Sequence, residues 1–149
     1  MYRYGIILLL LLGTTSMVKA QVFTDPTAAF ETALTRGKPV LLVFQGSDWC
    51  IPCIHLEHKV LSQPAFLDFV KDNLILLKAD FPQNKKLEAS LEQQYEALAE
   101  AYDKEGSFPK MILLDRNKKA IHTFRTDYTQ PSELVHDLEQ ELKKYHAEM

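Results

Sequence analysis

The sequence predicts a single domain of the layered α/β class, and two observations lead to this prediction. Short apolar runs at residues 40–45, 74–80 and 111–114 are typical of strands that are buried on both faces. Between these runs, apolar side chains recur every three or four residues, which is the spacing of amphipathic helices. Strands that alternate with helices favour a sheet covered by helices. A chain of 149 residues is also long enough to bury one core.

The first half of the domain is expected to read helix, strand, helix. Asp25 is a good N-cap and Pro26 suits the first helical position, so a helix begins there and ends at Gly37. Residues 40–45 form the first strand. Apolar residues then continue at helical spacing as far as Leu61. The segment 62–64 contains a proline and separates this helix from a second short apolar stripe.

The second half adds two helices and three strands. Residues 74–80 form a buried strand, and residues 87–102 have the repeat of a long amphipathic helix. Residues 111–114 and 120–125 form two strands joined across a polar turn, which predicts an antiparallel hairpin. A final helix follows Pro131. The expected order is therefore α-β-α-β-α-β-β-α.

The first twenty residues do not fit this globule. Arg3 precedes an apolar run, Gly5 to Leu12, that is too short to span a bilayer comfortably, and small residues near Ala20 suit cleavage before Gln21. We expect residues 1–20 to be a signal peptide and residues 21–149 to be the domain. The protein would then be exported, to the periplasm in a bacterium, with no stable membrane span after cleavage. An uncleaved anchor or an extracellular location are the alternatives.

The charge of the chain argues against nucleic acid as a partner. The formal net charge is −3, and it becomes more negative if Arg3 and Lys19 leave with a signal peptide. The basic residues do not gather into a patch, and they are not interleaved with aromatic residues as nucleic-acid binding requires.

The two cysteines of the chain, Cys50 and Cys53, form a C-x-x-C pair where a strand gives way to a helix. Reversible disulfide exchange needs a thiolate, a second thiol within reach, and access for a partner. We expect Cys50 in the first turn of the helix, solvent-reachable, where unpaired N–H groups and the helix dipole favour the thiolate. Cys53 would be the second thiol.

The residues between the cysteines also bear on the chemistry. Pro52 loses nothing near a helix start, where its missing N–H is not needed, and it stiffens the ring that a disulfide closes. Because no histidine lies between the cysteines, we expect the pKa of Cys50 to be only moderately lowered. The pair should then be a reductant or an isomerase-type couple rather than a strong oxidant.

The segment Trp49-Cys50-Ile51-Pro52-Cys53, placed after an apolar strand, resembles the active site of the thioredoxin family. Phe108-Pro109, just before a later strand, resembles the family's cis-proline. The resemblance runs from about Thr27 to about Tyr145. The segments 46–50 and 62–66 are similar to a secreted bacterial thioredoxin-like subgroup. The resemblance implies a three-layer α/β/α sandwich with a central mixed sheet of about four to five strands.

The resemblance also implies roles. Cys50 resembles the attacking cysteine and Cys53 the resolving cysteine, so the redox-active disulfide would serve with no other cofactor and no metal. Pro109 would lie against the disulfide, and the backbone of Phe108 would meet an extended substrate segment. The partners would be protein disulfides or dithiols, with an upstream thiol reductase or oxidase.

The chain departs from the family in the strand before the motif. Thioredoxins usually carry a buried aspartate there, whereas this strand ends Val43-Phe44-Gln45 without an acid. Lys78 resembles the lysine that accompanies that aspartate. The proton relay that the aspartate provides therefore has no evident counterpart in the sequence.

Several other interpretations remain open. Two cysteines in an exported protein can form a purely structural bond, although so small a ring gains little stability. C-x-x-C also binds zinc or copper, with His55 and His58 as further ligands, but Cys53 and His58 would face different sides of one helix. The two histidines fit a polar helix face better than a metal site, and from that face one of them could tune Cys50. Trp49 could cover the disulfide and touch substrate, or only pack. A non-catalytic binding domain with an inert disulfide is the last alternative.

Overall fold

The computed structural model describes residues 22–148, so the expected signal peptide lies outside the described residues. Five strands form one mixed sheet in the order β1-β3-β2-β4-β5. Strands β1, β3 and β2 are parallel, β4 is antiparallel to β2, and β5 is antiparallel to β4. The strands are β1 (Val22–Phe23), β2 (Val40–Gln45), β3 (Ile75–Asp80), β4 (Lys110–Leu114) and β5 (Ala120–Phe124).

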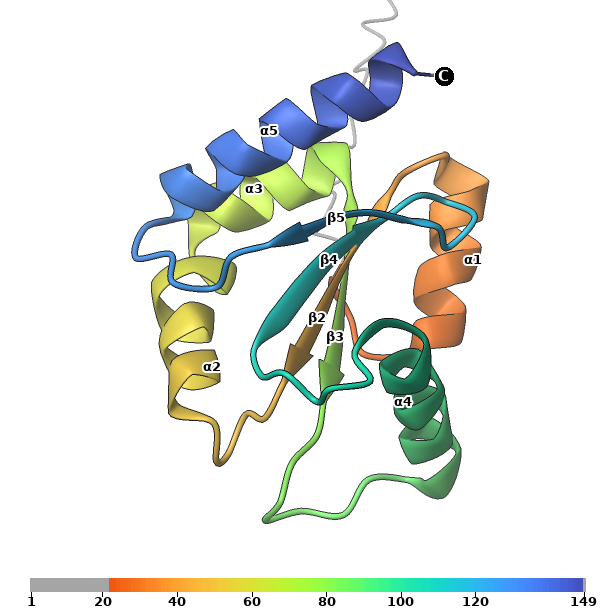
Figure 1. Ribbon diagram of the computed structural model, residues 1–149, viewed down its shortest axis with the longest axis vertical. Coiled ribbons are helices and arrows are strands. Elements are labelled where there is room, and N and C mark those ends of the chain that lie inside the picture. Colours follow the sequence, from red (N-terminus) through yellow and green to blue (C-terminus); the bar gives the residue numbers. More distant parts are fainter. Residues whose placement is uncertain (1–21, 149) are drawn as a thin grey trace, which may run out of the picture.

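Helices cover both faces of the sheet (Figure 1), which confirms the three-layer sandwich. One face carries α1 (Pro26–Arg36) and α4 (Ala89–Tyr102). The other face carries α2 (Ile51–Leu56), its continuation η1 (Glu57–Leu61), α3 (Pro64–Asn73) and α5 (Pro131–Ala147). Within residues 22–148, none of these helices is both long enough and apolar enough to cross a bilayer.

The central strand β2 contributes side chains to two separate cores, because side chains alternate between the faces of a sheet. Leu41 and Val43 pack in the core beneath α2, α3 and α5, whereas Leu42 and Phe44 pack in the core beneath α1 and α4. All six residues of β2 are buried. This explains the continuous apolar run in the sequence, and it makes β2 a rigid support for the loop that follows it.

Local signals in the sequence set several helix ends. The Asp25 carboxylate accepts a hydrogen bond from Ala28 N at 3.0 Å, which caps α1, and Pro26 takes the first helical position. Gly37 ends α1 with a left-handed φ of 64°, a conformation that glycine adopts without strain. Ser62 is the C-cap of η1, Gln63 is the N-cap of α3, and Pro64 begins α3, so the predicted break lies where the sequence placed it.

Two elements were not predicted. Strand β1 has only two residues, too few to produce an alternating pattern, and it is recognised by its pairing with β3. The segment η1 is a π-helix. It widens the end of the second helix, and a wider turn leaves no distinct apolar period in five residues.

The topology brings three loops to one edge of the sheet. The parallel strands β2 and β3 end together, with Gln45 paired to Asp80. Strand β4 runs antiparallel to β2 and therefore begins at the same edge, with Lys110 paired to Phe44. The residues after β2, after β3 and before β4 consequently meet there, and the two cysteines lie in the first of these loops and the helix it leads into.

Candidate active site

Cys50 and Cys53 form a disulfide at the start of α2. Cys50 is the N-cap of the helix rather than a residue of its first turn, one position earlier than the sequence suggested. Its Sγ accepts a hydrogen bond from the backbone N–H of Cys53 at 3.3 Å. Its own N–H donates to the oxygen of Gly46 at 2.9 Å, which fixes the loop that precedes the helix. Pro52 lies within the first turn, as predicted.

The disulfide lies just beneath the surface. Cys50 is 5% exposed and Cys53 is 2% exposed, so Cys50 is the more accessible of the two, although less open than the sequence led us to expect. The residues on either side of Cys50 are far more open: Trp49 is 38% exposed and Ile51 is 60% exposed. The open side of the disulfide is therefore the side of Trp49, Cys50 and Ile51.

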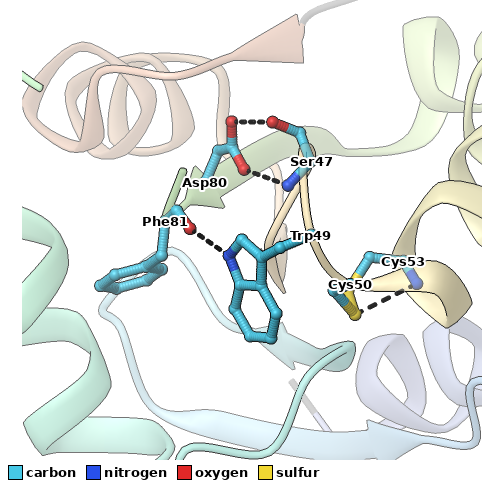
Figure 2. Close-up of a disulfide and its surroundings, with 6 residues drawn as sticks. All are labelled: Ser47, Trp49, Cys50, Cys53, Asp80 and Phe81. Atoms are coloured by element: carbon cyan, nitrogen blue, oxygen red, sulfur yellow. Dashed lines mark hydrogen bonds between the residues drawn. A yellow bond between two sulfur atoms is a disulfide. The ribbon is translucent and has the colours of Figure 1, made fainter. Parts of the chain in front are cut away.

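Trp49 is held by contacts from the other two loops. Its indole Nε1–H donates to the oxygen of Phe81 at 2.7 Å (Figure 2). Its ring meets the ring of Phe108 edge-on at 5.5 Å, and the bond between Phe108 and Pro109 is cis. A Cβ on Gly46 would come within 2.3 Å of the indole, so only glycine allows the ring to lie against the backbone there. Trp49 is therefore both packed and partly open.

Two acidic side chains join the loop after β2 to the loop after β3. The Asp80 carboxylate accepts hydrogen bonds from Ser47 N at 2.8 Å and Ser47 Oγ at 2.6 Å (Figure 2). The Asp48 carboxylate accepts from the backbone N–H groups of Gln83 and Asn84 at 2.9 and 2.7 Å. These two N–H groups hold the pKa of Asp48 below its ordinary value, because they stabilise the charged carboxylate. We call these four bonds the loop clasp.

Lys78 lies in β3, on the face that α2 and η1 cover, and it pairs with an acid that the sequence analysis did not single out. Its Nζ lies 2.6 and 2.8 Å from the two carboxylate oxygens of Glu57. The side chains are 13% and 29% exposed. Glu57 is four residues after Cys53, a spacing that places the two on the same side of a helix. Strand β2 carries no acid, and Phe44 is fully buried there. The acid near the C-x-x-C motif is instead Glu57, on the helix that follows the motif.

His55 and His58 are both exposed on the second helix. No group of three or more His, Cys, Asp or Glu side chains in residues 22–148 is arranged to hold a metal ion.

The clasp residues could have been found from the sequence by one further step. Residues that follow two parallel neighbouring strands meet at one edge of the sheet. Ser47 and Asp48 follow the first strand and Asp80 ends the next one, so polar contacts between these loops are expected. The pairing of Lys78 with Glu57 carries no such signal, because it depends on how the second helix packs.

Comparison with known proteins places this geometry among thioredoxin-like proteins. The sequence model of the thioredoxin-like family matches residues 14–116. The disulfide bond reductase DsbH of Chlamydia pneumoniae is 31% identical over 93 residues, which are 62% of this chain and 55% of that protein. The thioredoxin-related protein DsbJ of Chlamydia pneumoniae is 29% identical over 97 residues, 62% of this chain and 28% of that protein. The chain thus spans about half the length of DsbH and a smaller share of DsbJ.

Solved structures agree with the fold. The structure described as DsbH oxidoreductase superposes with a TM-score of 0.76 at 26% identity, covering 89% of this chain and 92% of that one. The reduced C-terminal domain of Neisseria meningitidis DsbD superposes with a TM-score of 0.57 at 25% identity, covering 77% of this chain and 92% of that domain.

Proposed function

This chain belongs to the thioredoxin-like family, and from that premise we propose that it is a thiol–disulfide oxidoreductase acting on partner proteins. One observation carries the proposal: the two cysteines are close enough to bond and lie at the start of a helix, with Cys50 the more accessible. The reductase named among its relatives supports the same reaction class.

The reaction proceeds in two exchanges. The Cys50 thiolate attacks one sulfur of a partner disulfide, the partner S–S bond breaks, and the second partner sulfur leaves as a thiolate. Cys53 then attacks the Sγ of Cys50, which forms the internal disulfide and releases the first partner sulfur. The partner gains two electrons and two protons, and the Cys50–Cys53 pair loses them. An upstream thiol reductase must return both electrons before the next cycle.

The residues around the disulfide have separate roles in this proposal. The N–H of Cys53, which reaches Cys50 Sγ at 3.3 Å, stabilises negative charge on the attacking sulfur. Trp49 and Phe108 offer a firm aromatic surface beside it, and the backbone of Phe108 and Pro109 receives an extended segment of the partner. No histidine separates the cysteines, so the direction we propose is reduction or isomerisation rather than strong oxidation.

The test is reduction of insulin with dithiothreitol as the electron donor. The protein should accelerate the reaction well above the rate of dithiothreitol alone, and Cys50→Ser should lose the acceleration. An equal rate with and without the protein would contradict the proposal and leave the inert binding domain as the interpretation.

We also propose that residues 1–20 direct export to the periplasm, where disulfide substrates are available. The apolar run and the small residues near Ala20 support this assignment. Fractionation of a bacterial host, with the mass of the purified protein, tests it: a periplasmic protein that begins at Gln21 is the expected result. A full-length protein in the cytoplasmic fraction would contradict it.

A further inference from the structure

A buried carboxylate lies beneath the loop that carries Phe108 and Pro109. Asp103 ends α4 and is 2% exposed. Its Oδ1 accepts hydrogen bonds from Ser107 N at 3.0 Å and from Lys110 Nζ at 3.1 Å. Its backbone oxygen accepts from Gly106 N at 2.9 Å. One residue therefore holds the middle and the far end of the loop between α4 and β4.

The stability of the fold does not account for this arrangement. Within the described residues, the second carboxylate oxygen, Oδ2, is buried without a hydrogen-bond partner. A buried polar atom left unpaired costs about 1–3 kcal/mol. A buried ion pair is often no more stable than well-packed apolar side chains of similar size. The buried charge of Asp103 is better explained by its effect on the loop between α4 and β4, which it holds in one conformation.

The conformation so imposed determines where Phe108 lies. Phe108 follows Ser107 directly and precedes Lys110 by two residues, so both contacts of Asp103 flank it. The ring of Phe108 meets the rings of Trp49 and Phe81 edge-on, each at 5.5 Å. A shift of the loop would therefore move the aromatic surface next to Cys50.

We propose that Asp103 is a positioning residue for substrate binding: it fixes the loop that presents Phe108, and it sets the affinity for polypeptide substrates without altering the chemistry of the cysteines. The inference rests on the proposed oxidoreductase function. It predicts a division of effects, because Asp103 contacts the loop and not the disulfide. Binding of an extended polypeptide depends on the loop, whereas reaction with a small disulfide depends on the two cysteines and their helix and not on the loop.

The experiment compares Asp103→Asn with the parent protein in three measurements. With insulin, KM should rise about tenfold and kcat should stay within about twofold of the parent, the pattern expected when uniform binding is lost. The rate of the reduced protein with oxidised glutathione and the reduction potential of the Cys50–Cys53 pair should both remain unchanged. The matched control is Glu105→Gln, because Glu105 also approaches Lys110, at 3.6 Å, but is 76% exposed.

A second variant guards against loss of folding. Asp103→Leu combined with Lys110→Met removes both charges, so no lone charge is buried and the fold should persist. Its KM for insulin should still be raised, because Ser107 N–H has lost its acceptor. A parental KM in both variants, or an equal loss with glutathione and insulin, would overturn the positioning role. A parent protein that fails to reduce insulin would instead overturn the proposed function itself.

Discussion

Two lysine–carboxylate pairs lie on opposite faces of the sheet, and they differ in what they connect. Lys78 of β3 pairs with Glu57 on the face that α2, α3 and α5 cover. Lys110 of β4 pairs with Asp103 at the end of α4, on the other face. The carboxylate of Asp103 is completely buried, whereas that of Glu57 is 29% exposed. Each pair joins a strand of the rigid sheet to a different part of the site.

This difference indicates that the two pairs affect different properties of the site. Glu57 lies one turn after Cys53, so the first pair acts on the helix that carries the redox chemistry. Asp103 holds the loop of Phe108, so the second pair acts on the surface that receives the substrate. Disruption of the first pair should change reaction rates with every disulfide. Disruption of the second should change only the reaction with proteins.

The largest effect should come from the cysteines, which both pairs serve. Cys50→Ser should abolish insulin reduction, because the remaining thiol, Cys53, is the less accessible of the two cysteines. Cys53→Ser should instead accumulate a mixed disulfide, since the resolving thiol is gone. Gel electrophoresis without reductant distinguishes the two. A mixed disulfide on Cys53 in the Cys50→Ser protein would reverse the assigned roles.

The next largest effect should follow from Lys78→Met, which leaves the Glu57 carboxylate without its cation. The free energy of unfolding should fall by about 1–3 kcal/mol, as expected for a partly buried charge left unpaired. The uncompensated negative charge next to the motif should also disfavour the Cys53 thiolate and slow the second exchange. Denaturant unfolding and rapid-mixing kinetics with oxidised glutathione measure the two effects.

The control for this variant is the pair Lys78→Met and Glu57→Gln together. With both charges removed, most of the lost stability and rate should return. A double variant as slow as Lys78→Met would show that the lysine acts by packing rather than by charge, and the division between the two pairs would be incorrect.

A smaller effect is expected for Trp49→Phe, at the point where the three loops meet. The substitution removes the hydrogen bond to Phe81 O but keeps an aromatic ring beside Phe108. The free energy of unfolding should fall by about 0.5–1.5 kcal/mol, the net contribution of one hydrogen bond. KM for insulin should rise while the rate with oxidised glutathione is retained. Equal losses with insulin and oxidised glutathione would mean that Trp49, like the Lys78–Glu57 pair, affects the chemistry of the cysteines rather than substrate binding.

The smallest effect should be an acid sensitivity of the loop clasp. The folded pKa of Asp48 lies below its ordinary value of 3.8, so its contribution to stability is present above that value and is lost as pH falls through the folded pKa. Asp48→Asn should therefore lower Tm at neutral pH. The difference in Tm between the variant and the parent protein should become smaller in acid. Thermal unfolding from about pH 7 to pH 3 measures this. A constant difference would mean that Asp48 does not titrate in the clasp.

Much of the fold could be predicted from particular residues. The apolar run of β2, the caps at Asp25 and Gly37, and the break at Pro64 each depend on neighbours in the chain. The C-x-x-C pair was recognisable for the same reason, since its two sulfurs need only one turn of backbone to meet.

The rest depends on contacts that the chain makes over long distances. Glu57 meets Lys78 across 21 residues, and Trp49 meets Phe81 across 32. Neither Glu57 nor Asp103 could be assigned its lysine partner from the sequence, because nothing in the neighbouring residues distinguishes them from the other acids of the chain. Cys50 is also more buried than expected, because the burial of a side chain depends on how distant segments of the chain pack around it.

The central claim is that the Cys50–Cys53 disulfide is cycled rather than structural, and a redox titration tests it most directly. Equilibration of the protein in glutathione or dithiothreitol buffers, with thiol trapping, gives the reduction potential. We predict a single two-electron transition between about −270 and −180 mV, the range of thioredoxin and protein disulfide isomerase. A disulfide that resists reduction until below about −300 mV would be a structural bond and would contradict the account.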